Sequence, residues 1–219
     1  DLEWAMDEVA LAAFGYQGQK CSATSRAVVM EKVYPAFLEG IEQRARAWAH
    51  EAGLPTENAL FGPVISETAH KRVLDYCEQA PKWGRMVVGG RAMDRPGYYV
   101  EPTVVKDVDP RSPIFQDEIF GPVLSVAPAR TFEEALELSN LSEYALTGAV
   151  FSRSPERLAK ARDEFYVGNL YLNRSSTGAM AGVHPFGGYR FSGTGPKVGG
   201  PDYLGFFLEA QTITEKVRF

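Results

Sequence analysis

Short apolar runs alternate with amphipathic segments from the first residues of the chain to Leu172. Residues 2–14 carry apolar side chains at helical spacing, whereas Ala27-Val28-Val29-Met30 has the β-branched content of a strand. A strand that is followed by a helix and then another strand needs a crossover connection, so this alternation favours parallel pairing. The sequence therefore predicts an α/β domain with a mostly parallel sheet flanked by helices.

Local signals set the ends of the expected elements. Pro35 stands in the first turn of one helix, Ser66 is a candidate N-cap, and Thr131 with Glu134 forms a capping box. The expected helices span 2–14, 34–50, 66–80, 131–140 and 155–165, and the expected strands span 26–33, 86–89, 98–105, 123–126, 146–151 and 167–172.

The pattern changes after Asn173, where residues 173–201 become rich in glycine and lose regular periodicity. A loop of this length in a compact domain is usually functional. A short helical segment at 203–207 follows, and then an alternating strand at 211–217. Because this strand has no local partner, it is either a sheet edge or an arm donated to a neighbouring subunit.

Composition excludes several classes of function. The net charge of −5 and the isoelectric point near 5.3 argue against a nucleic-acid partner, because phosphate neutralisation needs clustered Lys and Arg. No apolar run is long enough to span a membrane. Two distant cysteines and three scattered histidines offer neither a disulfide framework nor a metal site, and they favour a reducing compartment.

The chain starts at Asp1 inside a helical pattern, so we expect a fragment or a processed piece.

The two cysteines occupy different settings. Cys77 falls on the apolar face of the 66–80 helix, which indicates a structural role. Cys21 lies between a glycine-containing turn and a run of small hydroxylic residues, where a nucleophile is both held and reachable. A protease pairing of Cys21 with His184 lacks a recognisable orienting Asn or Asp, and no Cys-x-x-Cys redox motif is present. Cys21 is therefore the candidate nucleophile.

The sequence contains no cradle for nucleotide phosphates. Gly193-Thr194-Gly195 lacks the third glycine of the dinucleotide fingerprint, and it neither follows a strand nor opens a helix. A P-loop is absent as well. Any nucleotide that takes part in the chemistry must be held at its phosphates by residues outside this chain.

Three motifs, in this order, resemble the aldehyde dehydrogenase superfamily. They are Gly18-Gln19-Lys20-Cys21, then Glu118-Ile119-Phe120-Gly121-Pro122, then Pro185-Phe186-Gly187-Gly188 with Ser192-Gly193. The resemblance covers essentially the whole chain and corresponds to the C-terminal, catalytic half of such enzymes. It implies an aldehyde dehydrogenase catalytic domain over 1–205, a C-terminal oligomerisation strand over 206–219, and an NAD-binding domain of the Rossmann type outside the chain.

A finer resemblance involves residues 14–23, Thr177-Gly178-Ala179 and residues 192–197. These segments look like those of the glutamate-γ-semialdehyde (1-pyrroline-5-carboxylate) dehydrogenases, which include stand-alone enzymes and modules of bifunctional proline-utilisation proteins. The resemblance implies NAD-dependent oxidation of L-glutamate γ-semialdehyde to L-glutamate in proline catabolism, with a fused or separate proline dehydrogenase as partner. The choice between NAD and NADP stays open, because the adenosine-ribose contacts would lie in the missing half.

The same resemblance implies catalytic and cofactor roles. Cys21 would attack the aldehyde carbon to give a thiohemiacetal, and its own backbone N–H would help to hold the oxyanion. A thioester would follow and be hydrolysed by water. Glu118 would accept hydrogen bonds from the nicotinamide ribose hydroxyls, and Phe120 would pack beside the nicotinamide. The glutamate base and an asparagine oxyanion donor lie upstream in the family, so the isolated chain is expected to be inactive.

Substrate choice would fall to Ser22, Gly178, Ala179 and Phe186. The backbone N–H groups of Gly178 and Ala179, together with the Ser22 hydroxyl, would hold the α-carboxylate of the substrate in an anion nest. Phe186 would pack on the aliphatic chain. A purely structural glycine loop is the alternative for this segment.

Two rival interpretations remain. The chain could be a non-catalytic assembly domain related to aldehyde dehydrogenases by fold alone, although such a domain is expected to lack the nucleophile. It could also be an aldehyde dehydrogenase of another substrate class. Family resemblance further implies a homo-oligomer in which residues 212–217 add to a sheet edge of a partner subunit, and a cytoplasmic location or, in a eukaryote, the mitochondrial matrix.

Overall fold

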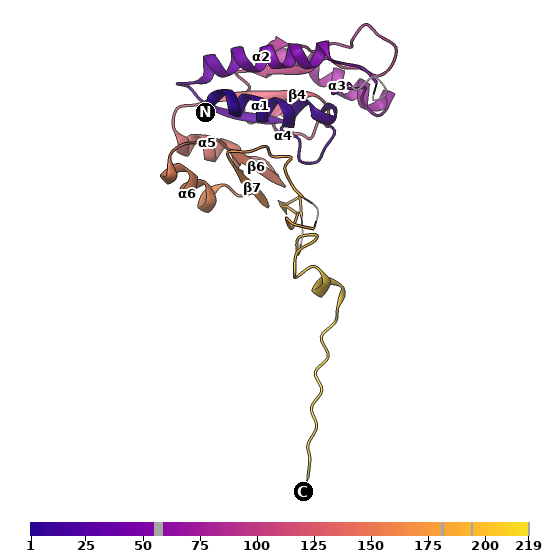
Figure 1. The fold of residues 1–219 in the computed structure, drawn as a ribbon, viewed down its shortest axis with the longest axis vertical. Helices are drawn as coiled ribbons and strands as arrows, with labels where there is room; N and C mark the ends of the chain where they lie inside the picture. Colours follow the sequence, from indigo (N-terminus) through magenta and orange to yellow (C-terminus); the bar gives the residue numbers. More distant parts are fainter. Residues whose placement is uncertain (55–58, 181, 194, 219) are drawn as a thin grey trace.

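The computed structural model describes residues 1–54, 59–180, 182–193 and 195–218. A body of sheets and helices is followed by a tail that extends away from it (Figure 1). The helices are α1 (Leu2–Phe14), α2 (Tyr34–His50), α3 (Glu67–Gln79), α4 (Pro113–Gln116), α5 (Phe132–Ser139) and α6 (Pro155–Glu164), with short 3-10 helices η1 (Gly15–Gly18), η3 (Ala80–Lys82) and η4 (Leu204–Phe207). No helix in these ranges is both long and apolar enough to cross a membrane.

The main sheet has four strands in the order β1-β4-β3-β2. These are β1 (Arg26–Met30), β2 (Arg85–Val88), β3 (Thr103–Lys106) and β4 (Val123–Ala129). β4 pairs in parallel with both β1 and β3, and Val28 lies opposite Ala127, whereas β2 is antiparallel to β3. The sheet is therefore mostly parallel, and the expected α/β class is confirmed.

Neighbouring residues of the central strands feed two separate cores, because side chains alternate across a sheet. Val104 and Leu124 point to the side where α1 and α2 pack with Phe14 and Ile41. Val105 joins the opposite core, whose other members from α3 and the 114–119 segment include Val73, Cys77, Ile114, Phe115 and Ile119. The sheet thus has helices on both faces, as parallel sheets require.

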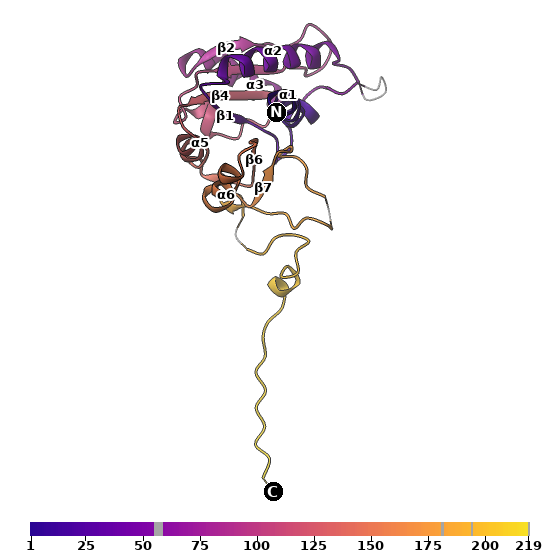
Figure 2. The same cartoon turned by 60° about the vertical axis from the view of Figure 1, so that its left-hand side comes forward.

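A second, smaller unit lies below the main sheet in both views (Figures 1 and 2). Its parallel strands β6 (Thr147–Val150) and β7 (Asn169–Leu172) pair with Gly148 opposite Leu170, and α6 connects them. A further short pair, β5 (Tyr144–Ala145) and β8 (Tyr189–Arg190), ties the glycine-rich segment to this unit.

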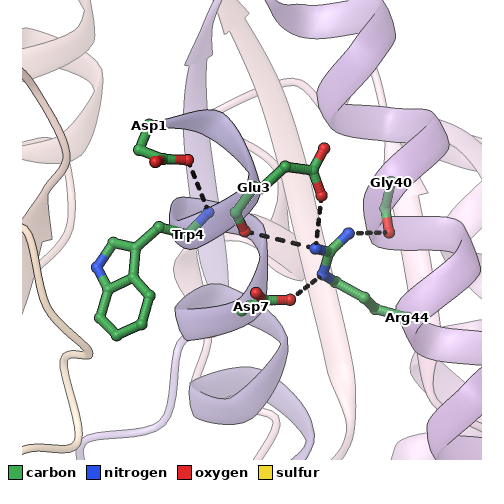
Figure 3. A network of polar contacts seen from close by, with 6 residues as sticks. All are labelled: Asp1, Glu3, Trp4, Asp7, Gly40 and Arg44. Atoms are coloured by element: carbon green, nitrogen blue, oxygen red, sulfur yellow. Dashed lines mark hydrogen bonds and ion pairs between the residues drawn. The ribbon is translucent and has the colours of Figure 1, made fainter.

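Arg44 of α2 fixes the position of α1. Its guanidinium donates to the Asp7 carboxylate at 2.7 Å and to the Glu3 carboxylate at 3.0 Å, and both acids lie on α1 (Figure 3). Asp1 caps α1 by accepting a hydrogen bond from Trp4 N at 3.2 Å. Exposed ion pairs contribute only about 0.2–1 kcal/mol each, so the main effect of this clamp is to orient α1 and the turn that follows it.

Several expected boundaries need correction. The 26–33 strand ends at Met30, because Val33 N donates to Met30 O at 2.9 Å and closes a turn there. The 98–105 extended segment forms a strand only from Thr103. The short helix α4 was not expected, because its four residues are too few for a helical period to be recognised.

The predicted strand at 211–217 forms no strand in the single chain. Residues 208–218 are exposed and extended, and in both views they project from the body (Figures 1 and 2). The sheet-edge alternative is therefore wrong for the described residues, because no sheet of the chain offers this segment a partner. An exposed extended segment without a neighbouring strand leaves its backbone N–H groups to water and forms no ladder.

Candidate active site

The chain reverses direction after α1 through three residues with left-handed backbone. Tyr16, Gln17 and Gly18 have φ angles of 54°, 57° and 66°. Glycine adopts this conformation freely, whereas Tyr16 and Gln17 each cost roughly 1–2 kcal/mol. Backbone strain of this kind concentrates at functional sites, so it adds a structural reason to consider the adjacent cysteine.

Cys21 and Ser22 occupy the two central positions of a turn over 20–23, which is closed by a backbone hydrogen bond of 3.0 Å. Cys21 is exposed and its thiol is free. The turn is attached to α1 because Thr24 N donates to Ala12 O at 3.1 Å. The structure thus places Cys21 at the exposed tip of a fixed turn, which is the placement that the sequence indicated.

Two of the sequence motifs are packed against each other at a glycine contact. A Cβ atom added at Gly18 would lie 2.2 Å from the carbonyl oxygen of Gly121. A Cβ atom added at Gly121 would lie 2.3 Å from a methyl group of Val73 on α3. Backbones can approach this closely only where no side chain intervenes. The glycine contact between Gly18 and Gly121 therefore brings the Cys21 motif next to the Glu118 motif.

Cys21, Glu118 and Phe120 line one cavity of about 770 Å³. Glu118 is exposed, and its carboxylate makes no hydrogen bond or ion pair with the described residues. Phe120 has a φ of 57°, which is an outlier for a bulky side chain. The structure therefore gathers the candidate nucleophile and both candidate cofactor-binding residues at a single site.

The loop after β7 closes one side of this cavity through residues that the sequence reasoning missed. Ser175 and Ser176 line it and are buried, with 8% and 6% of their surface exposed. The Ser176 hydroxyl donates to Ser22 O at 3.0 Å and lies 2.9 Å from the Thr24 hydroxyl. The adjacent serines between Asn173 and Thr177 were the only available signal, and nothing in the sequence showed that they meet the cysteine turn.

The residues predicted to bind the substrate do not line the Cys21 cavity. Ser22 adjoins Cys21 but does not line the cavity. Gly178, Ala179 and Phe186 do not line it either. The carbonyl of Gly178 accepts a hydrogen bond from Arg174 at 2.7 Å, and Ala179 is exposed. Phe186 is half-buried and pairs its backbone with Val198. Their substrate role stays a prediction.

His184 does not form a catalytic pair with Cys21 in the described structure. Its Nδ1 accepts a hydrogen bond from Met180 N at 3.3 Å, and it does not line the Cys21 cavity. Within the described residues, no group of three or more His, Cys, Asp or Glu side chains could hold a metal ion. The geometry therefore gives no support to the protease alternative.

Arg26 adds a positive charge to the cavity wall and was also missed. Its guanidinium donates to Phe115 O at 3.3 Å and lies 5.5 Å from the centroid of the Phe115 ring. Burial, with a smaller contribution from Arg190, lowers the pKa of Arg26 to about 10. The group still carries its charge at neutral pH, and this charge favours anionic groups in the same cavity.

Cys77 contrasts with Cys21 in every respect. It is only 3% exposed, and its thiol lies 4.0 Å from the Thr103 hydroxyl in the core between α3 and the sheet. Burial raises the pKa of the Cys77 thiol to about 11. A protonated and inaccessible thiol is unreactive, which agrees with the structural role predicted for it.

Comparison with known proteins gives one consistent result. The aldehyde dehydrogenase family model matches residues 1–213. The chain is 48% identical over 216 residues to a 1-pyrroline-5-carboxylate dehydrogenase of Geobacillus kaustophilus, which covers 98% of this chain and 42% of that protein. The chain therefore spans less than half the length of such relatives.

Solved structures show the same similarity. The structure of a Thermus 1-pyrroline-5-carboxylate dehydrogenase with bound NAD superposes with a TM-score of 0.92 at 47% identity, covering 95% of this chain and 40% of that one. Proline utilization A (PutA) from Bdellovibrio bacteriovorus matches with a TM-score of 0.89 at 44% identity, over 95% of this chain and 22% of that one. The sheet, the cysteine turn and the family match lead to one conclusion: this chain belongs to the aldehyde dehydrogenase family.

Proposed function

We propose that this chain supplies the nucleophile-bearing part of an NAD-dependent dehydrogenase that oxidises L-glutamate γ-semialdehyde to L-glutamate in proline catabolism. The observation that carries the proposal is the cavity in which an exposed cysteine at a fixed turn meets Glu118 and Phe120. The names of the Geobacillus and Thermus proteins, at 48% and 47% identity, support the choice of substrate.

Cys21 is the nucleophile in this proposal. Its thiolate forms a bond to the aldehyde carbon, and the carbonyl oxygen becomes an oxyanion that the Cys21 backbone N–H can stabilise. Loss of hydride from the same carbon leaves a thioester on Cys21, and water then cleaves the sulfur–carbon bond to release the carboxylate. The fixed turn matters here because covalent catalysis depends on a reacting atom held in position.

NAD is the cofactor in this proposal, and when bound it supplies the hydride acceptor. The site offers groups that suit it. Glu118 places an unpaired carboxylate at the cavity, and two carboxylate oxygens can accept both hydroxyl protons of a ribose diol. The strained backbone of Phe120 holds an aromatic ring beside the same cavity. Glu118 and Phe120 would thus bind the nicotinamide end, and the phosphates would be bound by residues outside the chain.

The substrate's amino-acid end is assigned to the loop that follows Ser176. Ser22 is hydrogen-bonded to Ser176 through its backbone, so the cysteine turn and this loop form one unit. Gly178 and Ala179 would supply backbone N–H donors to the α-carboxylate, and Phe186 would contact the aliphatic part. Gly178, Ala179 and Phe186 do not line the cavity in this structure. For these residues to contact a substrate bound to Cys21, the loop would have to move toward Cys21.

The substrate assignment is tested by comparing L-glutamate γ-semialdehyde with an unbranched aliphatic aldehyde of similar length. The assay uses a protein that contains residues 1–219 together with the remaining family segments. We expect the semialdehyde to be favoured in kcat/KM by at least tenfold, since the anion nest recognises a carboxylate that the control substrate lacks. Equal kcat/KM values would refute this substrate and favour another aldehyde class.

The catalytic assignment has its own test in the same protein. Cys21→Ala should abolish NADH formation with every aldehyde, and Cys77→Ala should retain kcat within a few-fold. Turnover that persists in Cys21→Ala would overturn the nucleophile and favour the assembly-domain alternative.

We further propose that residues 1–205 form the catalytic domain and residues 206–219 an arm that binds a partner subunit. Leu208, Ile213 and Val217 are exposed in the single chain, where an alternating strand would be expected to bury one face. Deletion of the residues after Glu209 should release monomers on size-exclusion chromatography. An unchanged elution volume would contradict the arm.

The PutA similarity supports a proline dehydrogenase, fused or separate, as the functional partner.

A further inference from the structure

The segment around Glu118 is bonded to α3 at the residues directly before and after Glu118. The Tyr76 hydroxyl donates to the Asp117 carboxylate at 2.7 Å, and Arg72 Nε donates to Ile119 O at 3.1 Å. Glu118 itself is exposed, and no described residue bonds to its carboxylate. The position of this carboxylate therefore depends on how its two neighbours are held.

The two bonds come from one face of α3. Arg72 and Tyr76 are four residues apart, and such residues are neighbours on the surface of a helix. Val73 lies against Gly121, where an added Cβ atom would be 2.3 Å from a Val73 methyl group. The Ile119 side chain is only 3% exposed and packs in the same core as Val73. α3 thus contacts every second residue of the segment, and the residues in between are the two candidate cofactor-binding residues.

α3 is a firm support for these contacts. Ser66 caps its first turn by accepting a hydrogen bond from Ala69 N at 3.2 Å. Val73 and Cys77 anchor it in the core, with 0% and 3% of their surface exposed. Side chains presented by a helix that is fixed in this way hold a site more precisely than side chains on loops do.

The Tyr76 ring is itself held in place. Its centroid lies 6.3 Å from that of the Trp83 ring, and the two planes are inclined by 46°. Burial, followed by the hydrogen bond to Asp117, raises the pKa of Tyr76 to about 12. The phenol therefore keeps its proton at neutral pH and can donate it to the Asp117 carboxylate.

A fixed backbone matters for the job that Glu118 would do. A carboxylate can accept both hydroxyl protons of a ribose diol, but only when its two oxygens face the diol together. A freely moving segment would lose conformational entropy each time the cofactor bound, and this loss would weaken binding. Bonds that order the segment beforehand remove that cost.

We propose that Arg72 and Tyr76 are positioning residues for the cofactor, which hold the chain on both sides of Glu118 so that its carboxylate meets the ribose hydroxyls at the nicotinamide end. This inference rests on the cofactor role proposed for Glu118. Arg72 and Tyr76 are not among the residues that line the Cys21 cavity. Their effect on the cofactor is exerted through Asp117 and Ile119.

The test uses the full-length protein that contains residues 1–219, and it measures the Kd of NAD by calorimetry and the KM of the semialdehyde. Tyr76→Phe and Arg72→Met should each weaken NAD binding three- to tenfold and leave the KM of the aldehyde within twofold. Lys71→Met is the matched control, because Lys71 forms an exposed ion pair with Asp75 of the same helix at 2.7 Å. The control should keep the Kd of NAD within twofold of the native value.

Substitutions at Asp117 show whether Tyr76 acts through this residue. Asp117→Ala should weaken NAD binding as much as Tyr76→Phe does. Asp117→Asn keeps an oxygen that can accept the Tyr76 proton, so its Kd should stay within twofold of the native value. Tyr76→Phe combined with Asp117→Ala should bind NAD no more weakly than either single variant, because both remove the same bond.

Glu118→Gln separates a failure of this inference from a failure of the proposed function. It should weaken NAD binding at least as much as Tyr76→Phe does. If Glu118→Gln binds NAD like the native protein, the cofactor role of Glu118 is wrong, and the positioning role is wrong with it. If Glu118→Gln weakens binding but Tyr76→Phe and Arg72→Met behave like the Lys71→Met control, the cofactor role stands and the positioning role is overturned. Equal increases in the Kd of NAD and the KM of the aldehyde would also overturn it, because they would show a general loss of structure.

Discussion

The turn of Cys21 and the helix face of Cys77 place the same side chain in opposite environments. Cys21 is exposed at the tip of a turn that hydrogen bonds hold to α1 and to the loop after β7. Cys77 is enclosed by the core between α3 and the sheet, with its pKa raised by burial to about 11. Accessibility and backbone fixation, rather than the residue type, decide which thiol can do chemistry.

The two regions are also mechanically connected. Gly121 touches Gly18 on the Cys21 side and Val73 on the α3 side, and Val73 lies in the same core as Cys77. The core that makes Cys77 inert is therefore the support against which the Cys21 turn rests. Each of the following predictions changes one side of this arrangement.

The largest expected difference is in thiol reactivity. Iodoacetamide should modify Cys21 at the rate of an accessible thiol, whereas Cys77 must wait for opening of the core. For a domain that is several kcal/mol stable, this slows Cys77 by at least about 10³-fold. Peptide mass spectrometry over a time course measures both rates, and rates within tenfold of each other would contradict the comparison.

Gly18→Ala should destabilise the chain by about 2–4 kcal/mol, because it combines a positive φ with overlap onto the Gly121 carbonyl. Gly182→Ala is the matched control. Gly182 also has a positive φ, of +75°, but a Cβ there meets no atom within 4 Å. The control should cost only about 1 kcal/mol. Urea unfolding measures the free energy of unfolding of both variants. Equal decreases in the two would show that the contact between Gly18 and Gly121 does not contribute to stability.

High pH should remove the contribution of the Cys77 thiol to the free energy of unfolding. Its pKa is raised from 9.0 to about 11, so the folded protein keeps the proton longer than the unfolded chain does. Stability from this group is therefore complete below pH 9 and is lost as pH rises toward 11, by about 3 kcal/mol at most. The unfolding free energy of the native chain, relative to Cys77→Ala, should fall over this window. If the difference in unfolding free energy between the native chain and Cys77→Ala stays constant over this pH range, the pKa of Cys77 is not raised by folding.

Ser176→Ala should have the smallest effect, about 1 kcal/mol, because it removes the hydrogen bonds to Ser22 O and to the Thr24 hydroxyl. Amide exchange over residues 20–24 should become faster. Ser175→Ala is the control, since the Ser175 hydroxyl bonds within its own loop to Thr177 at 2.8 Å. If both variants loosen the cysteine turn equally, the specific contact through Ser176 is not what holds it.

Most elements could be predicted because their signals are local. The capping box at Thr131 is seen as a hydrogen bond from Glu134 N at 3.1 Å, and Ser66 caps α3 in the same way. The candidate nucleophile Cys21 and the Glu118 motif were singled out from short patterns. Each of these depends on residues within a few positions of one another.

The features that were missed depend on residues far apart in the sequence. The contact of Ser176 with the Cys21 turn joins positions 154 apart, and no local pattern encodes it. The left-handed backbone of Tyr16, Gln17 and Phe120 contradicts the preference of those residues, so only tertiary packing can impose it. The tail at 211–217 has the period of a strand, but a strand also needs a neighbour.

The glycine contact also has a consequence for how such a chain can change over generations. A side chain at Gly18 would push away the Gly121 carbonyl and with it the acidic motif, whereas a side chain at Gly121 would push against Val73 of α3. Either position can therefore accept a side chain only if the group that it faces has moved away first. The conformation of the Gly18 turn is thus tied to that of the Gly121 segment, although β1, β2 and β3 lie between them in the sequence.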